Sequence, residues 1–418
     1  MSDTKNTDRL DYLLTFYIGL GFFTTGITWS LYNSYVPIFL REYVFGSWQN
    51  LIIGIIMVLD NIAAITLQPW IGAKSDHTWT RFGRRMPYIL LGVPIAAFFF
   101  GLIPLANSFL VLLAVVTIFN ISMAIYRAPV VALMPDIIPS KFRSKANGVI
   151  NLMGGVGAIY AFFVGSYLYE YSPPLAFWST SVIMLIALAI LFWKVKEPEK
   201  PELHDDVEKI GIVDAFREVI SNPDRSGILI LLAIFTWFLG YNIIETWYTT
   251  YGVVVLGIPD YIASRTLTTF ALSFVVFAIP AGFVATKIGR KNTIVIGLVG
   301  LIVSLFAMIF VTNVTLIYVI LGVAGLFWAF ININSITIVW EIATGKKLGA
   351  YTGLYYFFSA FAAIVGPVFS GLIFDIVGLR IMFWLSTGLM VIALLFTLGV
   401  KSGEVSETEV VVPPLEMD

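Results

Sequence analysis

The sequence contains no cysteine and only two histidines among 418 residues. The absence of cysteine excludes disulfides, cysteine-ligated zinc and iron–sulfur centres. No GxxxxGK[ST] phosphate-binding loop is present, which argues against ATP as the driving force. The long apolar segments also lack a Ser/His/Asp set, a His/Asp metal cluster and closely spaced carboxylate pairs. We therefore expect that the protein is not an enzyme and uses no cofactor or metal.

Charged residues are also scarce, at 12% of the chain, whereas hydrophobic residues make up 59%. Globular proteins carry about 25% charged residues, so this chain has too few to cover a surface in water. The net charge of −1 gives no indication of a nucleic-acid partner. The N-terminal stretch MSDTKNTDRLDYLL is polar and mixed in charge, without the pattern of a cleavable signal peptide. The composition predicts an integral membrane protein whose main solvent is lipid.

Long apolar runs recur along the whole chain, and a transmembrane helix needs about 20 such residues. We predict twelve spans, at approximately 12–40, 50–72, 86–106, 109–135, 147–170, 175–194, 226–256, 261–286, 291–312, 314–341, 347–376 and 380–400. One set of alternate loops carries little beyond Arg41, Arg265 and Arg380, whereas the other set carries Lys74, Arg81, Arg84, Arg85, Lys141, Arg143, Lys145, Lys287, Arg290, Lys291, Lys346 and Lys347. Because basic loops stay on the cytoplasmic side, we expect a multi-pass protein of the inner or plasma membrane with both termini in the cytoplasm.

The longest polar segment, 195–225, divides the spans into two sets of six. Its second part, IGIVDAFREVISNPDR, is compatible with an amphipathic helix on the membrane surface and equally with a plain linker. The predicted domains are an N-terminal six-helix bundle over 1–194, the cytoplasmic linker, a C-terminal six-helix bundle over 226–400 and a cytoplasmic tail over 401–418.

The two halves resemble each other in their loops. DIIPSKFRSKANGV begins at Asp136 after the fourth span, and EIATGKKLGAYTGL begins at Glu341 after the tenth. In both segments a lysine follows the acid after five residues, and a glycine follows that lysine after seven. The turn after the second span is echoed after the eighth by PAGFVATKIGRK. The sequence therefore predicts an all-α membrane protein of twelve transmembrane helices in two pseudo-symmetric six-helix bundles, the plan of a secondary transporter.

The turn between the second and third spans carries a family resemblance. From Gln68 to Ile89 it reads QPWIGAKSDHTWTRFGRRMPYI, with four residues between Asp76 and Arg81. With this turn, the chain resembles the major facilitator superfamily over essentially its whole length. Within it, the chain resembles the sucrose/proton symporters and the wider glycoside–pentoside–hexuronide:cation symporter family.

The resemblance extends to the fourth span, where Arg127-Ala128 is similar to the Arg-Ala pair of the sucrose symporters. Those symporters carry a proton-accepting aspartate eleven residues before the arginine, and this chain has Val116 at that position. Melibiose-type members of the wider family instead place acidic cation ligands on the second span, the region of Asp60. The resemblance implies coupling to H⁺ or Na⁺ but leaves the coupling acid open.

Ionisable residues inside a bilayer are costly, so each one needs a partner or a task. Three lie away from the ends of the predicted spans: Asp60, Arg127 and Glu245. A carboxylate removed from water binds a proton or pairs with a cation, so Asp60 and Glu245 compete as the cation-coupling residue. Arg127 is predicted to donate to a carboxylate in one state and to substrate hydroxyls in another.

A sugar offers apolar C–H faces and a ring of hydroxyls, which match aromatic rings and amides. Spans one, four, seven and ten, which line the central cavity in the superfamily, carry such residues. The predicted substrate-binding residues are Trp29, Tyr32, Asn33, Asn120, Arg127, Trp237, Tyr241, Glu245, Tyr248, Trp328 and Asn332. Packing roles are the alternative for each aromatic residue and each amide in the set.

Charged residues at the cytoplasmic ends of spans are interpreted as a gate that closes in one state and opens in the other. The predicted gate residues are Asp76, Arg81, Arg84, Arg85, Asp136 and Glu341. We expect Asp76 to face the start of the eleventh span, and Arg85 or Arg81 to pair with Asp136. The alternative, simple anchoring of the loops by the positive-inside rule, would account for the arginines but not for Asp76 or Asp136.

The sequence thus predicts a secondary transporter that moves a sugar by alternating access, coupled to H⁺ or Na⁺. A glycoside, and in particular a disaccharide, is the favoured substrate, and the protein is expected to work as a monomer in membrane lipid. An amphipathic or lipid-like solute is the alternative. A membrane-embedded enzyme or a non-transporting sensor is a weaker one, since no soluble output domain is present.

Overall fold

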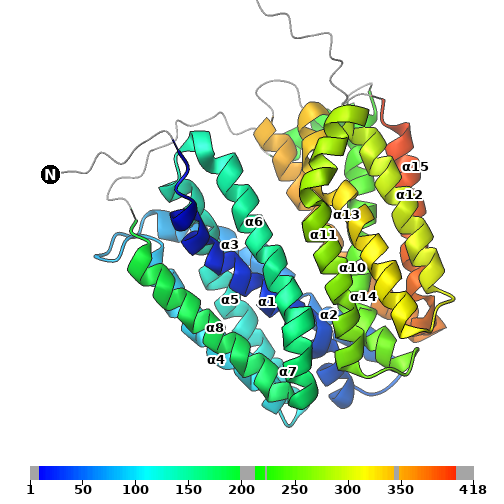
Figure 1. The fold of residues 1–418 in the computed structure, drawn as a ribbon, viewed down its shortest axis with the longest axis horizontal. Coiled ribbons are helices and arrows are strands. Elements are labelled where there is room, and N and C mark those ends of the chain that lie inside the picture. The colour runs from blue at the N-terminus through cyan, green and yellow to red at the C-terminus, as the bar shows by residue number, and fades with distance from the viewer. Residues whose placement is uncertain (1–8, 198–211, 222–223, 343–347, 402–418) are drawn as a thin grey trace, which may run out of the picture.

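The protein forms two helical bundles joined side by side (Figure 1). The computed structural model describes residues 9–197, 212–221, 224–342 and 348–401. Within these ranges no β-strand occurs, and twelve helices are long and apolar enough to cross a membrane. The predicted all-α fold of two six-span bundles is confirmed. The boundaries proposed for the linker and tail stay predictions, because residues 198–211 and 402–418 lie outside the described ranges.

The N-terminal bundle contains spans one to six. Its helices are α1 (Tyr12–Tyr43), α2 (Gln49–Met57), α3 (Leu59–Asp76), α4 (Met86–Leu102), α5 (Phe109–Ile137), α6 (Arg143–Tyr160), α7 (Ser166–Tyr171) and α8 (Pro173–Lys194). The second span is interrupted at Val58, so that Asp60 lies in the first turn of α3. The fifth span contains a π-helical turn, Ala161–Gly165, between α6 and α7. Such turns are frequent at functional sites.

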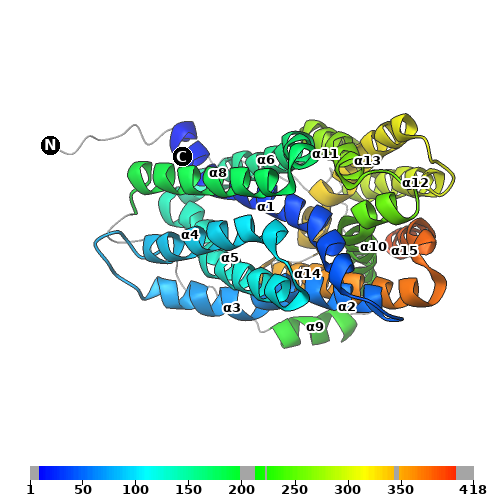
Figure 2. The same cartoon turned by 90° about the horizontal axis from the view of Figure 1, so that it is seen from below.

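The C-terminal bundle contains spans seven to twelve. Its helices are α10 (Ser226–Val254), α11 (Asp260–Ile288), α12 (Arg290–Met308), α13 (Val314–Ile342), α14 (Leu348–Val377) and α15 (Met382–Gly399). Between the bundles the chain forms α9 (Ile212–Ser221), which packs against α14 (Figure 2). The rings of Phe216 and Phe358 lie 6.0 Å apart in this contact. The sequence was compatible with either an amphipathic helix or a plain linker in this segment, and the structure contains a helix there.

The turns after the second and eighth spans have the same local geometry, as their sequences predicted. Gly83 and Gly289 both adopt positive φ, 104° and 85°, immediately before an arginine. Only glycine adopts such a conformation readily, which explains its place in both turns. Arg84 then pairs with Asp136, and Arg290 with Glu341. The pseudo-symmetry read from the loops therefore extends to their ion pairs.

Contacts between the bundles include those of α2 with α14, α1 with α10 and α6 with α11. We call the end that carries the start of α1 and the end of α15 the terminal face, and the opposite end the distal face. In Figure 1 the bundles diverge toward the terminal face. On the distal face, Asp375 of α14 caps the N-terminus of α2 in the other bundle, accepting from the backbone N–H groups of Asn50 at 3.0 Å and Leu51 at 2.8 Å. A carboxylate at a helix N-terminus is stabilised by the free N–H groups and the helix dipole.

A second contact on the distal face joins α7 to α11. The hydroxyl of Tyr169 donates to Asp260 at 2.9 Å, and Arg265 donates to Glu170 at 2.5 Å. Close backbone packing supports the contact of α2 with α14, because a Cβ atom at Gly54 would lie 2.3 Å from the carbonyl oxygen of Pro367. The structure is therefore closed on the distal face, and its central site lies between the bundles.

Candidate functional site

The site between the bundles consists of two connected cavities. The larger, which we call the aromatic chamber, has a volume of about 350 Å³. The smaller, the polar chamber, has a volume of about 220 Å³. Trp29, Asn33 and Glu245 line both, so the two chambers meet where α1 faces α10. Helices from both bundles therefore line two adjoining cavities.

The polar chamber gathers the ionisable residues predicted within the spans. Its lining residues are Trp29, Asn33, Met57, Asp60, Asn61, Arg127, Asn242, Glu245, Thr246, Ala363 and Pro367. Asn61 donates to the Asp60 carboxylate at 2.9 Å. Arg127 faces this chamber from α5 and therefore does not extend toward the membrane surface. With both acids and the guanidinium ionised, the chamber would hold one net negative charge.

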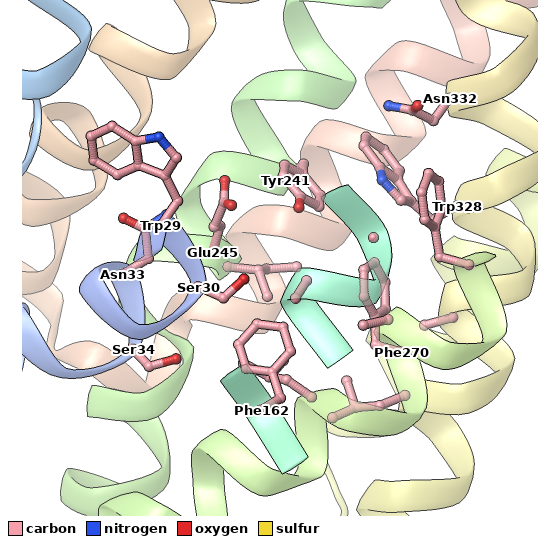
Figure 3. Close-up of a pocket in the computed structure, with 18 of the residues that line it drawn as sticks. Trp29, Ser30, Asn33, Ser34, Phe162, Tyr241, Glu245, Phe270, Trp328 and Asn332 are labelled. Carbon is pink, nitrogen blue, oxygen red and sulfur yellow. The ribbon is translucent and has the colours of Figure 1, made fainter. Parts of the chain in front are cut away.

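Glu245 occupies the junction of the chambers. It lies deep inside the protein, on α10, yet its side chain keeps accessible surface because it borders both cavities. Asn33 and Tyr241 line the aromatic chamber together with it. Figure 3 shows Glu245 between Trp29 and Asn33 on one side and Tyr241 on the other. A solute in either chamber would contact this carboxylate.

The aromatic chamber is bounded on one side by a stacked pair of rings. Tyr241 and Trp328 lie 4.4 Å apart with an angle of 4° between their planes. Phe238 packs edge-on against Trp328 at 5.8 Å, and Phe270 lies 6.5 Å from Tyr241. Asn332 lines the same chamber one helical turn beyond Trp328. Aromatic faces of this kind bind flat apolar groups and the C–H faces of sugar rings.

Four of the predicted substrate-binding residues lie in packed protein. Tyr32 and Asn120 are buried and joined by a hydrogen bond of 3.2 Å, and Tyr32 stacks on Phe119. Tyr248 is buried and shares a 2.6 Å hydrogen bond with Thr266. Trp237 is also fully buried. In this conformation none of the four lines either chamber, so their predicted contact with substrate would need another conformation.

The predicted gate residues form an ion-pair network on the terminal face. Arg84 contacts Asp136 through two hydrogen bonds of 2.6 and 3.2 Å, and Arg85 donates to the same carboxylate at 2.8 Å. Arg85 also pairs with Asp76. Arg81 is exposed, with its guanidinium 4.6 Å from the centre of the Phe82 ring. This network joins residues of one bundle.

Glu341 forms the corresponding pair with Arg290 in the C-terminal bundle. The expected contact of Asp76 with the start of the eleventh span remains a prediction for a state in which the terminal face is closed. Closure of that face would bring the two networks toward each other, since each lies at the terminal end of its own bundle.

We expect Asp136→Ala to destabilise the protein more than Glu341→Ala, the matched change in the other bundle. Asp136 is 11% exposed and accepts from two arginines, so its removal leaves Arg84 without its carboxylate partner and Arg85 with Asp76 alone. Loss of one partner from a buried ion pair costs about 3 kcal/mol or more. Thermal unfolding of both variants in detergent measures the difference. Equal shifts in Tm would contradict the stabilising role given to Asp136.

A sequence profile of the Major Facilitator Superfamily matches residues 18–267 and 262–413. The chain belongs to this superfamily. The resemblance seen in the turn after the second span is therefore confirmed at the level of the superfamily.

Individual relatives are distant and diverse. The tetracycline resistance protein, class B, of Escherichia coli is 23% identical over 344 residues, covering 81% of this chain and 83% of that protein. The isoprimeverose transporter of Lactiplantibacillus pentosus is 23% identical over 309 residues, covering 69% of this chain and 62% of that protein. A solved bacterial homolog of the human lysosomal transporter Spinster, inward-facing and occupied, superposes with a TM-score of 0.73 at 17% identity, covering 95% of this chain and 98% of that chain. The fold is thus shared, while the names of the relatives point to different substrates.

Several residues at the site and in the networks were not predicted from the sequence. Glu197 accepts from the backbone N–H groups of Arg84, Arg85 and Met86 at 2.7 to 3.0 Å and so caps α4. Asp375 caps α2 in the same way. Their common signal is an acid close to a span end, which the sequence contains but whose partner helix only the fold identifies.

Proposed function

We propose that this superfamily member transports a glycoside across the membrane by alternating access, coupled to H⁺ or Na⁺. The observation that supports this proposal is the polar chamber, where two carboxylates, one guanidinium and three amides meet at the interface of the bundles. Amides and guanidinium donate to hydroxyl oxygens, and carboxylates accept from hydroxyl groups. The isoprimeverose transporter among the relatives agrees with a sugar substrate.

Coupling follows from the charges that line the polar chamber. Asp60 and Glu245 outnumber Arg127 by one negative charge, and an unbalanced charge inside the membrane is unfavourable. One bound H⁺ or Na⁺ would neutralise the chamber. The loaded site would then carry no net charge when the bundles rock, which ties movement of the solute to movement of the cation.

The distal face is closed in the structure, and the bundles diverge toward the terminal face. With both termini placed in the cytoplasm, this is an inward-facing conformation. Transport then requires that the contacts made by Asp375 and Arg265 break while the terminal face closes. The direction of net transport is set by the gradients.

Glu245→Gln is expected to change the apparent affinity for the solute or the pH dependence of uptake, because Glu245 borders both chambers. Glutamine keeps the size and one acceptor oxygen but loses the charge. Initial uptake rates across a range of pH measure both effects. Glu42→Gln, at an exposed position near the end of α1, is a control for removal of an acid elsewhere. An unchanged affinity and pH profile would make Glu245 structural.

The decisive test is uptake into proteoliposomes with a panel of sugars, each measured with a pH gradient, with a Na⁺ gradient and without either. Uphill accumulation of one glycoside under one of the two gradients would identify both the substrate and the cation. Absence of accumulation for every sugar under both gradients would contradict the proposal.

The aromatic chamber favours a second candidate, an amphipathic or lipid-like solute. Its wall on α11 and α13 is composed largely of phenylalanine, leucine and tryptophan side chains. Such a solute would bind without needing the amides of the polar chamber. Replacement of Asn61 and Asn242 by Ala would separate the two candidates, since it would weaken binding of a sugar but not of a wholly apolar solute.

A further inference from the structure

The two chambers differ in chemistry along one direction. Asn33, Ser30 and Glu245 lie at the end of the aromatic chamber nearest the polar chamber (Figure 3). Trp328 and Phe270 lie at the opposite end. Polarity therefore decreases from the side of α1 and α5 toward the side of α11 and α13, where Asn332 is the one amide among the lining residues. A bound solute would meet charged and amide groups at one end and apolar rings at the other.

The polar chamber by itself is small. Its volume of about 220 Å³ is below the range of about 300–1,000 Å³ that is usual for small-molecule sites. The aromatic chamber adds about 350 Å³ that is joined to it through Glu245. A solute that fills the site must therefore extend past Glu245 into apolar surroundings.

A purely hydroxylated solute does not match the apolar end. A second sugar ring placed beside Phe270, Phe274 and Leu267 would leave hydroxyls facing side chains that cannot hydrogen-bond. Burying a hydroxyl without a hydrogen-bond partner is unfavourable. A flat apolar group at the same place would instead stack on the parallel Tyr241 and Trp328 rings.

A cationic amphiphile is a poorer match for the polar end. Asp60 and Glu245 would attract a cation, but Arg127 lines the same small chamber and opposes a second positive charge there. The three amides, Asn33, Asn61 and Asn242, can donate and accept, which suits neutral hydroxyls. The polar chamber therefore favours a neutral head group, together with a separate small cation.

We infer that the solute is an amphipathic glycoside, with its sugar in the polar chamber and a flat apolar substituent, such as an aryl group, in the aromatic chamber. This inference rests on the proposed transport of a glycoside and narrows its substrate class. The aromatic chamber acts as the subsite for the substituent. Phe270 of α11 lines this subsite, so its replacement tests the preference for the substituent.

The experiment compares matched pairs of glycosides that share one sugar and differ only in the substituent. The probes are the methyl and 4-nitrophenyl α- and β-glycosides of glucose, galactose and xylose, together with maltose and cellobiose. Affinity is measured as inhibition constants or by thermal shift on the purified protein, and transport by uptake into proteoliposomes. Burial of an aromatic ring predicts that the preferred aryl glycoside binds at least about tenfold more tightly than its methyl partner.

Two variants on α11, each replacing a phenylalanine by leucine, test whether the preference for aryl glycosides arises in the aromatic chamber. Phe270→Leu is expected to reduce the aryl-to-methyl affinity ratio toward one, because the ring leaves the wall of the chamber. Phe283→Leu is the matched control, since Phe283 is 67% exposed on the outside of α11. It is expected to leave the ratio as in the parent protein.

The outcomes separate this inference from the proposed function. A disaccharide or methyl glycoside could bind as tightly as the aryl glycosides and be accumulated to the same level. The inference of an amphipathic substrate would then be wrong, while the proposed transport of a sugar would stand. If Phe270→Leu and Phe283→Leu give the same ratio as the parent, the assignment of the aromatic chamber is wrong. If no glycoside binds but tetraphenylphosphonium does, both the inference and the proposed function are overturned.

Discussion

Asp60→Asn is expected to abolish uphill accumulation of the solute while exchange of solute across the membrane persists. The amide has the size of the carboxylate and can still accept from Asn61, which donates to Asp60 at 2.9 Å. What it removes is one negative charge, and the polar chamber then holds one acid and one arginine. A chamber that is already neutral no longer requires a cation, so the cation gradient can no longer drive transport.

Proteoliposomes measure both activities of this variant, accumulation under an imposed gradient and counterflow without one. Asp11→Asn is the control acid-to-amide change. Asp11 caps α1 by accepting from Leu14, and asparagine caps helices about equally well, so transport should be unaffected. If Asp60→Asn accumulates solute as the parent does, the coupling role would pass to Glu245, the other carboxylate in the chamber.

Gly54→Leu is expected to keep the distal face from closing. A Cβ atom at Gly54 would lie 2.3 Å from the carbonyl oxygen of Pro367, and the same pair of helices approaches at Gly371, whose Cβ would lie 2.5 Å from the carbonyl oxygen of Asn50. Backbone atoms cannot move aside as a flexible side chain can, so α2 and α14 must separate. The protein should therefore shift toward conformations that open on the distal face, and transport should fall.

The lack of native cysteine makes this shift directly measurable. A cysteine replacing Ala363 would line the polar chamber on α14. Its labelling by an impermeant reagent from the distal side, in vesicles of known orientation, should rise by about tenfold in the Gly54→Leu background, since overpacking costs about 1–3 kcal/mol. Gly282→Leu is the control, because nothing lies within 4 Å of a Cβ at that glycine. Equal labelling of the Gly54→Leu and Gly282→Leu proteins would show that the Gly54 contact does not hold the distal face closed.

The candidate site illustrates which parts of a membrane transporter can be predicted from sequence. Asp60, Arg127 and Glu245 stand out because ionisable residues are rare within apolar spans, and the structure brings all three to one chamber. Trp29 and Trp328 fall on the expected helices and line the aromatic chamber. Tyr32 and Tyr248 satisfied the same criteria but are buried in packed protein. Residue type and helical spacing could not separate the two groups, because both depend on how each helix is rotated about its axis.

The sequence by itself determined the twelve spans, the duplication and the equivalent acids Asp136 and Glu341 at matching span ends. These features depend on local chemistry, because a bilayer requires about 20 consecutive apolar residues whatever the rest of the chain does. The tertiary structure decided which face is closed, that Asp375 caps a helix of the opposite bundle, and that the site divides into a polar and an aromatic chamber. Those features arise where helices distant in sequence meet, and their side chains find partners only after the bundles have packed.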